Sequence, residues 1–204
     1  GLSATPDRYF DDEGTTAVQD FFSGTVFEFS IEDALAWEPP PGATPILTPF
    51  TYKPLFVDLN DEETERYSKL TQALFGGGND EERNEKRRRI LQKRALIIKK
   101  AASKLPAFEK EIESRGSISN AIVYCQDDNQ AEEVLEVLKR QGVRAAKFSG
   151  EAGTTPRKEY GGLSERDWLL RDFIANRTDA LVAMKILDEG VDIPSARIGF
   201  VLAS

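Results

Sequence analysis

The chain contains no histidine and only one cysteine, Cys125, among its 204 residues. These absences exclude zinc sites of the common Cys/His type and catalysis by Ser-His-Asp or Cys-His arrangements. Any chemistry must therefore use carboxylates, hydroxyls, lysine, arginine or backbone groups, and we expect no metal site. Because Cys125 ends the apolar run 121–125, it should act as a small hydrophobic core residue rather than as a reactive thiol.

Long hydrophobic runs are also missing. No segment approaches the roughly 18 apolar residues that are needed to cross a bilayer, and residues 1–6 do not start a basic segment followed by an apolar one. We therefore expect a cytoplasmic protein with no membrane partner. A hydrophobic content of 40% is sufficient for one large globular domain or two small ones.

Positive charge is scarce except in one window. The formal net charge is -8, yet residues 83–104 contain ten Lys or Arg and one acid, which gives +9 there and -17 elsewhere. A basic helix face can bind phosphates, and Arg87, Arg88 and Lys93 are candidate nucleic-acid contacts. The alternative is a solvated helix face that balances acidic neighbours, because consecutive arginines point to different sides of a helix.

The first part of the chain has weak patterns. Residues 24–29 alternate as a strand does, and residues 31–37 predict a short helix with Ser30 as its N-cap. The pattern of 50–59 predicts extended backbone, where Pro54 favours an edge position.

A charged, helical segment follows. A helix is predicted to begin at Asn60 or Asp61 and to end at the glycines 76–78. From 80 to about 114 the sequence again favours helix, and we expect Pro106 to separate two helices.

After residue 116 strands and helices alternate. The expected strands are 121–125, 143–148, 180–184 and 198–202, and the expected helices are 129–141 and 164–176. Such alternation predicts a parallel sheet with helices on both faces. The strand 180–184 is apolar throughout, as buried parallel strands are, and the loop after it carries Glu189-Gly190-Val191-Asp192. Because open α/β sheets bind ligands at the carboxyl ends of their strands, this loop is well placed for chemistry.

Four segments, in this order, resemble motifs of the superfamily 2 helicases and translocases, in particular XPB-like and restriction-type DEAD/DEAH-box members. They are residues 1–6 (motif III), 121–125 with Ala131 (motif IV), 148–151 (motif IVa) and 187–194 (motif V). The resemblance implies an α/β, parallel-sheet RecA-like domain of the P-loop NTPase type, namely the helicase C-terminal domain. We expect residues 1–23 to end a first RecA-like domain and 24–204 to form most of the second, with a helical insertion at about 60–116.

In that family two RecA-like domains enclose ATP and Mg²⁺ and move along nucleic acid. The phosphate-binding loop belongs to the first domain, and no Gly-Lys pair occurs anywhere in this chain. The arginine-rich motif VI is expected after Ser204. No catalytic set is therefore complete here, and we expect the chain alone not to hydrolyse ATP, which the first domain would hold.

The resemblance also implies roles for individual residues. Those expected to face ATP are Gly190 and Asp192, those expected to contact nucleic acid are Gln126, Ser149, Gly150 and Lys185, and those expected to couple the two sites are Ser3 and Thr5. Met184 stands where the family commonly has Thr or Ser, so Lys185 would supply a cation in place of a hydroxyl.

Simpler roles stay open for several of these residues. Asp192 could cap local backbone, Ser149 and Gly150 could form an ordinary βα turn, Lys185 could be solvated surface, and Gln126 could cap the next helix. The function that the resemblance implies is the C-terminal motor domain of an ATP-dependent helicase or translocase, acting on DNA rather than RNA, in repair or in restriction and defence. The alternatives are a nucleic-acid-binding or protein-interaction module without a motor, and an unrelated Rossmann-like nucleotide-sugar transferase.

Overall fold

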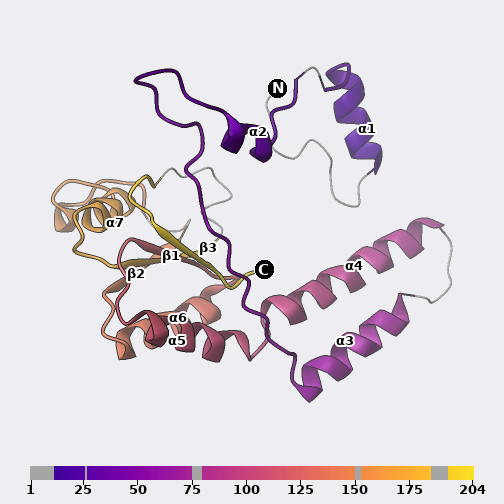
Figure 1. Ribbon diagram of the computed structural model, residues 1–204. Coiled ribbons are helices and arrows are strands. Elements are labelled where there is room, and N and C mark those ends of the chain that lie inside the picture. The colour runs from indigo at the N-terminus through magenta and orange to yellow at the C-terminus, as the bar shows by residue number, and fades with distance from the viewer. Residues whose placement is uncertain (1–11, 26, 75–79, 150–152, 185–192) are drawn as a thin grey trace. The chain divides into compact units, whose positions relative to one another are not determined.

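The computed structural model describes residues 12–25, 27–74, 80–149, 153–184 and 193–204 (Figure 1). The chain divides into two compact units, Gly1–Pro54 and Leu55–Ser204. In the described ranges no helix combines the length and apolarity that a membrane span requires. The predicted boundary between residues 23 and 24 stays a prediction.

A four-stranded parallel sheet forms the centre of the second unit. Its strands are β1 (Ala121–Tyr124), β2 (Ala145–Ser149), β3 (Ala180–Met184) and β4 (Ile198–Val201), and their order across the sheet is β2-β3-β1-β4. All three neighbouring pairs run parallel. The α/β fold with a parallel sheet that the sequence predicts is therefore confirmed.

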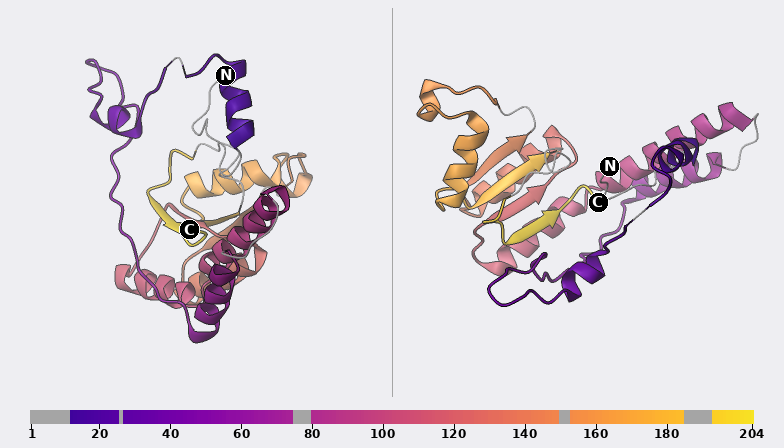
Figure 2. Two further views of the ribbon diagram at one scale, coloured as in Figure 1. Left: turned by 90° about the vertical axis from the view of Figure 1, so that its right-hand side faces the viewer. Right: turned by 90° about the horizontal axis from the view of Figure 1, so that it is seen from above.

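Helices cover both faces of this sheet (Figures 1 and 2). Helices α5 (Lys104–Arg115) and α6 (Asp128–Arg140) pack on one face, and α7 (Glu165–Ile174) packs on the other. Strand β3 is buried along its whole length because its alternate side chains enter the two cores. Val182 belongs to the core under α5 and α6, whereas Leu181 belongs to the core under α7.

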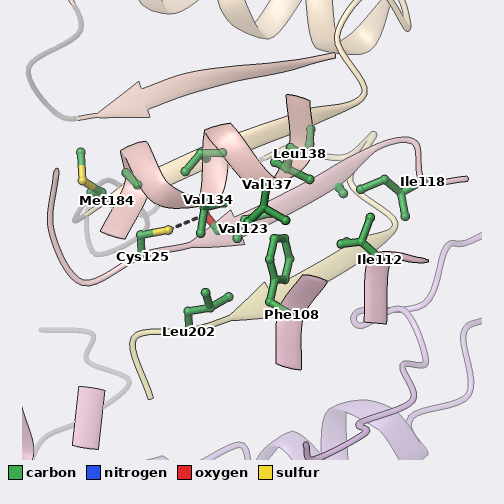
Figure 3. Packing of buried hydrophobic residues seen from close by; sticks show 14 residues of the cluster. Phe108, Ile112, Ile118, Val123, Cys125, Val134, Val137, Leu138, Met184 and Leu202 are labelled. Carbon is green, nitrogen blue, oxygen red and sulfur yellow. Dashed lines mark hydrogen bonds between the residues drawn. The ribbon is translucent and has the colours of Figure 1, made fainter. Parts of the chain in front are cut away.

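Cys125 is part of the larger core, as expected (Figure 3). Its side chain is buried, and its thiol donates a weak hydrogen bond to the carbonyl oxygen of Val123. Burial, and secondarily the nearby Asp127 carboxylate, raises the pKa of the Cys125 thiol to about 12. The thiol is therefore protonated at neutral pH and unreactive.

Two antiparallel helices precede α5 in the chain. Helix α3 (Asp61–Ala73) begins as predicted, because Asn60 and Glu63 form a capping box. Helix α4 (Asp80–Lys99) packs against it. The predicted break at Pro106 is wrong: α4 ends at Lys99 and α5 begins at Lys104. Pro106 lies in the first turn of α5, where a missing N–H donor costs no helical hydrogen bond.

The first unit has little regular structure. Helix α1 spans Asp12–Phe21, which the sequence did not predict, and α2 spans Ile31–Ala36 with Ser30 as its N-cap, as predicted. The strand predicted for 24–29 is wrong for the described residues, which form no β-ladder there. Alternation alone does not make a strand, since the backbone groups also need a partner strand.

Candidate functional site

The carboxyl ends of the four strands lie at one edge of the sheet. Ser149 ends β2 directly opposite Met184, the last residue of β3. On the other side of β3, Cys125 follows β1 and donates its N–H to the carbonyl oxygen of Ala183 at 2.8 Å. The structure therefore brings Ser149 and Gln126, two predicted nucleic-acid contacts, to the same edge, separated by β3. Both side chains are partly exposed there.

Six of the predicted site residues lie outside the described residues. They are Ser3, Thr5, Gly150, Lys185, Gly190 and Asp192. Two of these positions nevertheless follow described strands directly: Gly150 comes after β2 and Lys185 after β3. Their roles stay predictions.

The first turn of α6 fixes the residues after β1. Asp127 is the N-cap of α6, and its carboxylate accepts a hydrogen bond from the N–H of Gln130. Gln130 is only 9% exposed, and its side-chain oxygen accepts the N–H of Gln126 at 2.8 Å. The cap is therefore Asp127 and not Gln126, which leaves the side chain of Gln126 without that role.

The same turn also holds the end of α4. The side-chain nitrogen of Gln130 donates to the carbonyl oxygen of Lys99 at 3.3 Å, and Lys100 forms an ion pair with Asp127. The hydrogen bond from Lys100 is the main cause that lowers the pKa of the Asp127 carboxyl. The carboxyl end of β1 and the carboxyl end of α4 are thus joined through one helical turn.

We call residues 99–104, which connect the α3–α4 helix pair to α5, the hairpin root. Residues 102–104 form further contacts there. Lys104 donates from Nζ to the carbonyl oxygens of Leu202 and Ser204, which follow β4. Desolvation, followed by the charge of Lys99, lowers the pKa of this amine. The N–H of Ala102 donates to Glu63, so α3 is attached as well.

Helix α4 carries the basic side chains that the sequence singled out. Arg94 is used internally, since its guanidinium donates to the hydroxyl of Tyr67 at 2.5 Å and lies over that ring. Among the described residues, four exposed cations of α4 have no ion-pair partner: Lys86, Arg87, Arg88 and Lys93. At 1.5 Å per residue, Lys93 and Arg87 lie about 9 and about 18 Å from Lys99 along the helix axis.

At the opposite edge of the sheet, a second ion pair has a structural role. Arg144, just before β2, donates to the carboxylate of Asp179, just before β3, twice from its guanidinium and once from its backbone N–H. Hydrogen bonding to Arg144 lowers the pKa of the Asp179 carboxyl. This pair ties together the amino ends of two neighbouring strands, at the opposite end of the sheet from its carboxyl edge.

Sequence patterns missed Gln130 and the hairpin root. A polar residue in the first turn of a helix is ordinarily solvated, and the contacts of Gln130 with Lys99 span 31 residues. The only signal in the sequence is that Asp127 starts α6 directly after a strand, which places the following turn at the carboxyl edge.

In the part of the chain that the structure describes, no group of three or more acidic or cysteine side chains could hold a metal ion.

One family of known proteins matches the second half of the chain. Residues 103–202 match the family described as "Helicase conserved C-terminal domain", a segment that runs from the hairpin root through α5 to the end of β4. Among curated proteins nothing matches the chain.

Among solved structures, the chain is similar to the helicase domain of Hef from Pyrococcus furiosus, with 17% sequence identity and a TM-score of 0.38. The alignment covers 69% of this chain and 29% of that one, so the chain spans less than a third of the Hef structure. Residues 103–202 therefore form a parallel-sheet α/β domain that matches the helicase conserved C-terminal domain family.

Proposed function

We propose that the chain is the C-terminal motor domain of an ATP-dependent superfamily 2 helicase or translocase. In this proposal Gly190 and Asp192 face an ATP molecule that an N-terminal RecA-like domain of the parent protein holds together with Mg²⁺. The carboxyl edge of the sheet binds one nucleic-acid strand, DNA rather than RNA. Closure of the two domains on ATP moves the domain along that strand. Repair and restriction or defence in the cytoplasm are both compatible settings.

The observation that supports this proposal best is the clustering at one sheet edge. Ser149 and Gln126 lie at this edge. The strands β2 and β3, which precede Gly150 and Lys185, also end there. Ligands of open α/β sheets bind at this edge, and the helicase family match covers every one of its strands.

The proposal predicts that the 204-residue chain alone does not turn over ATP. Phosphoryl transfer requires a phosphate cradle, Mg²⁺ held by a carboxylate and a charge-stabilising arginine, and the sequence lacks the Gly-Lys pair of the cradle. A phosphate-release assay with the purified chain, ATP, Mg²⁺ and single-stranded DNA should give the rate of buffer. Turnover that DNA stimulates and that survives repurification of the chain would contradict the proposal.

A second candidate function is supported by the exposed cations of α4 that have no ion-pair partner among the described residues. A nucleic-acid-binding module without a motor would bind strands through Arg87, Arg88 and Lys93 and would need no ATP. The two functions differ in one measurable quantity, the affinity for the strand, because only a motor changes this affinity when ATP binds.

A further inference from the structure

The loop between β2 and α7 is built to present a short, closed segment. The N–H of Arg157 donates to the carbonyl oxygen of Leu163 at 2.9 Å, so residues 157–163 close on themselves. Within them lies a single 3-10 turn, Lys158–Tyr160, followed by Gly161 and Gly162 at positive φ. Residues other than glycine are strained at such φ angles, so the two glycines favour this closed conformation of the loop.

Two aromatic rings meet beside this closed loop. Tyr160 from the loop and Trp168 from α7 have ring centroids 5.6 Å apart and an interplanar angle of 39°. Both side chains are partly exposed rather than buried. Trp168 packs at the margin of the core under α7, which fixes one ring, and the hydrogen bonds of the loop fix the other.

Charges of both signs lie near the two rings: desolvation, and then the negative charges of Glu165 and Glu159, raise the pKa of the Tyr160 hydroxyl. The acids of this region are engaged locally: Glu165 accepts the N–H of Gly153, Asp167 accepts the hydroxyl of Ser164, and Glu159 pairs with Arg157. In the same region Lys158 and Arg171 are exposed and have no ion pair with another described residue. Lys158 is therefore an exposed cation of the closed loop that can pair with a phosphate.

We propose that Tyr160 and Trp168 form a stacking platform for an unpaired base of single-stranded nucleic acid, with Lys158 beside the adjoining phosphate. The proposal rests on the strand-binding part of the proposed function and adds a site that the motif residues do not include. Trp168 packs against the core cluster that contains Phe148, the residue before Ser149 in β2. Stacking suits a motor domain because every base has a π-face, so the contact does not depend on sequence.

Trp168 is itself the probe for the test. The chain has two tryptophans, so Trp37→Phe leaves Trp168 as the only one. Titration of this variant with an oligothymidine of about 20 nucleotides should quench the Trp168 emission by about a third or more at saturation, because a base stacked on an indole quenches its fluorescence. Inorganic polyphosphate, which has charge but no bases, should leave the emission unchanged.

Tyrosine variants test the second ring in the same assay. Tyr160→Ala should weaken oligothymidine binding about fivefold or more, whereas Tyr160→Phe, which keeps the ring, should bind as the unmodified chain does. Tyr52→Ala is the matched control, since Tyr52 is an exposed tyrosine of the other unit, and it should change nothing.

The outcomes separate this proposal from the proposed function. Binding of oligothymidine without quenching of Trp168, or equal binding by Tyr160→Ala and Tyr52→Ala, overturns the stacking platform and leaves strand binding by the domain intact. Absence of any binding to oligothymidine overturns both. Equal quenching by a duplex of the same length overturns the platform, since paired bases cannot stack on it.

Discussion

Replacing Arg87, Arg88 and Lys93 together with glutamine should make the salt dependence of single-strand binding distinctly shallower. The three cations are exposed and unpaired in the described part of the chain, and at 100° per residue they point to different sides of α4. One strand can therefore contact about two of them. Each lost phosphate contact reduces the slope of log affinity against log salt by about 0.7, so we expect a change of about 1.4. Binding titrations between about 50 and 200 mM salt measure this slope.

A charge-matched triple variant controls for the change in net charge. Arg66, Lys69 and Arg140 are equally cationic, but each is paired with a carboxylate: Glu62, Glu65 and Glu109 in that order. Their replacement by glutamine should leave the slope within about 0.3 of the original value. Equal slopes for the two triple variants would favour the simpler role of α4 as a solvated helix face.

Replacing Gln130 with alanine should destabilise the domain by about 2 kcal/mol, because it leaves the N–H of Gln126 and the carbonyl of Lys99 without their partner. The loss should be concentrated at the hairpin root. Hydrogen exchange of the backbone amides near residues 96–104 should therefore accelerate more than exchange in α7. Denaturant unfolding followed by circular dichroism measures the total change.

Gln141 at the other end of α6 provides the control. Its side chain also donates one hydrogen bond, to Glu113 at 3.1 Å, but this contact is exposed. Gln141→Ala should cost less than about 0.5 kcal/mol and leave exchange at the hairpin root unchanged. If Gln130→Ala behaved in the same way, the link between β1 and α4 would have no energetic importance.

This link has a consequence for how the domain works. The hairpin root contacts the residues after β1 through Asp127 and Gln130 and the residues after β4 through Lys104. Because these contacts lie at the edge where nucleotide and strand are proposed to bind, we expect movement of that edge to reach the basic helix α4. The basic helix would then be part of the motor rather than an independent appendage.

The sequence predicted the central strand β3 well because this strand is buried on both faces. Apolar runs such as 180–184 have few alternatives in a chain of this composition, and the observed strand β3 has the predicted bounds. The N-cap Ser30 was equally clear, since a side chain that accepts a backbone N–H is a local signal, and the helix predicted to start at Asn60 or Asp61 does start there.

Sequence patterns did not predict the contacts between segments that are distant in the chain. The strand predicted at 24–29 failed because no partner strand pairs with its described residues. The helix break before Lys104 was misplaced because proline is tolerated in a first turn. The hydrogen bonds of Gln130 and the contact between Tyr160 and Trp168 became visible only in the structure, since the partners come from different elements.

The most direct test of the motor function is the effect of an ATP analogue on strand binding by the full parent protein. A motor domain that closes on ATP must change its affinity for the strand, and a coupling factor of about fivefold or more is typical of linked sites. We expect a non-hydrolysable ATP analogue to change the affinity for oligothymidine by at least that factor, and Asp192→Ala to remove the change. Equal affinity with and without the analogue would contradict the motor function and favour the binding module.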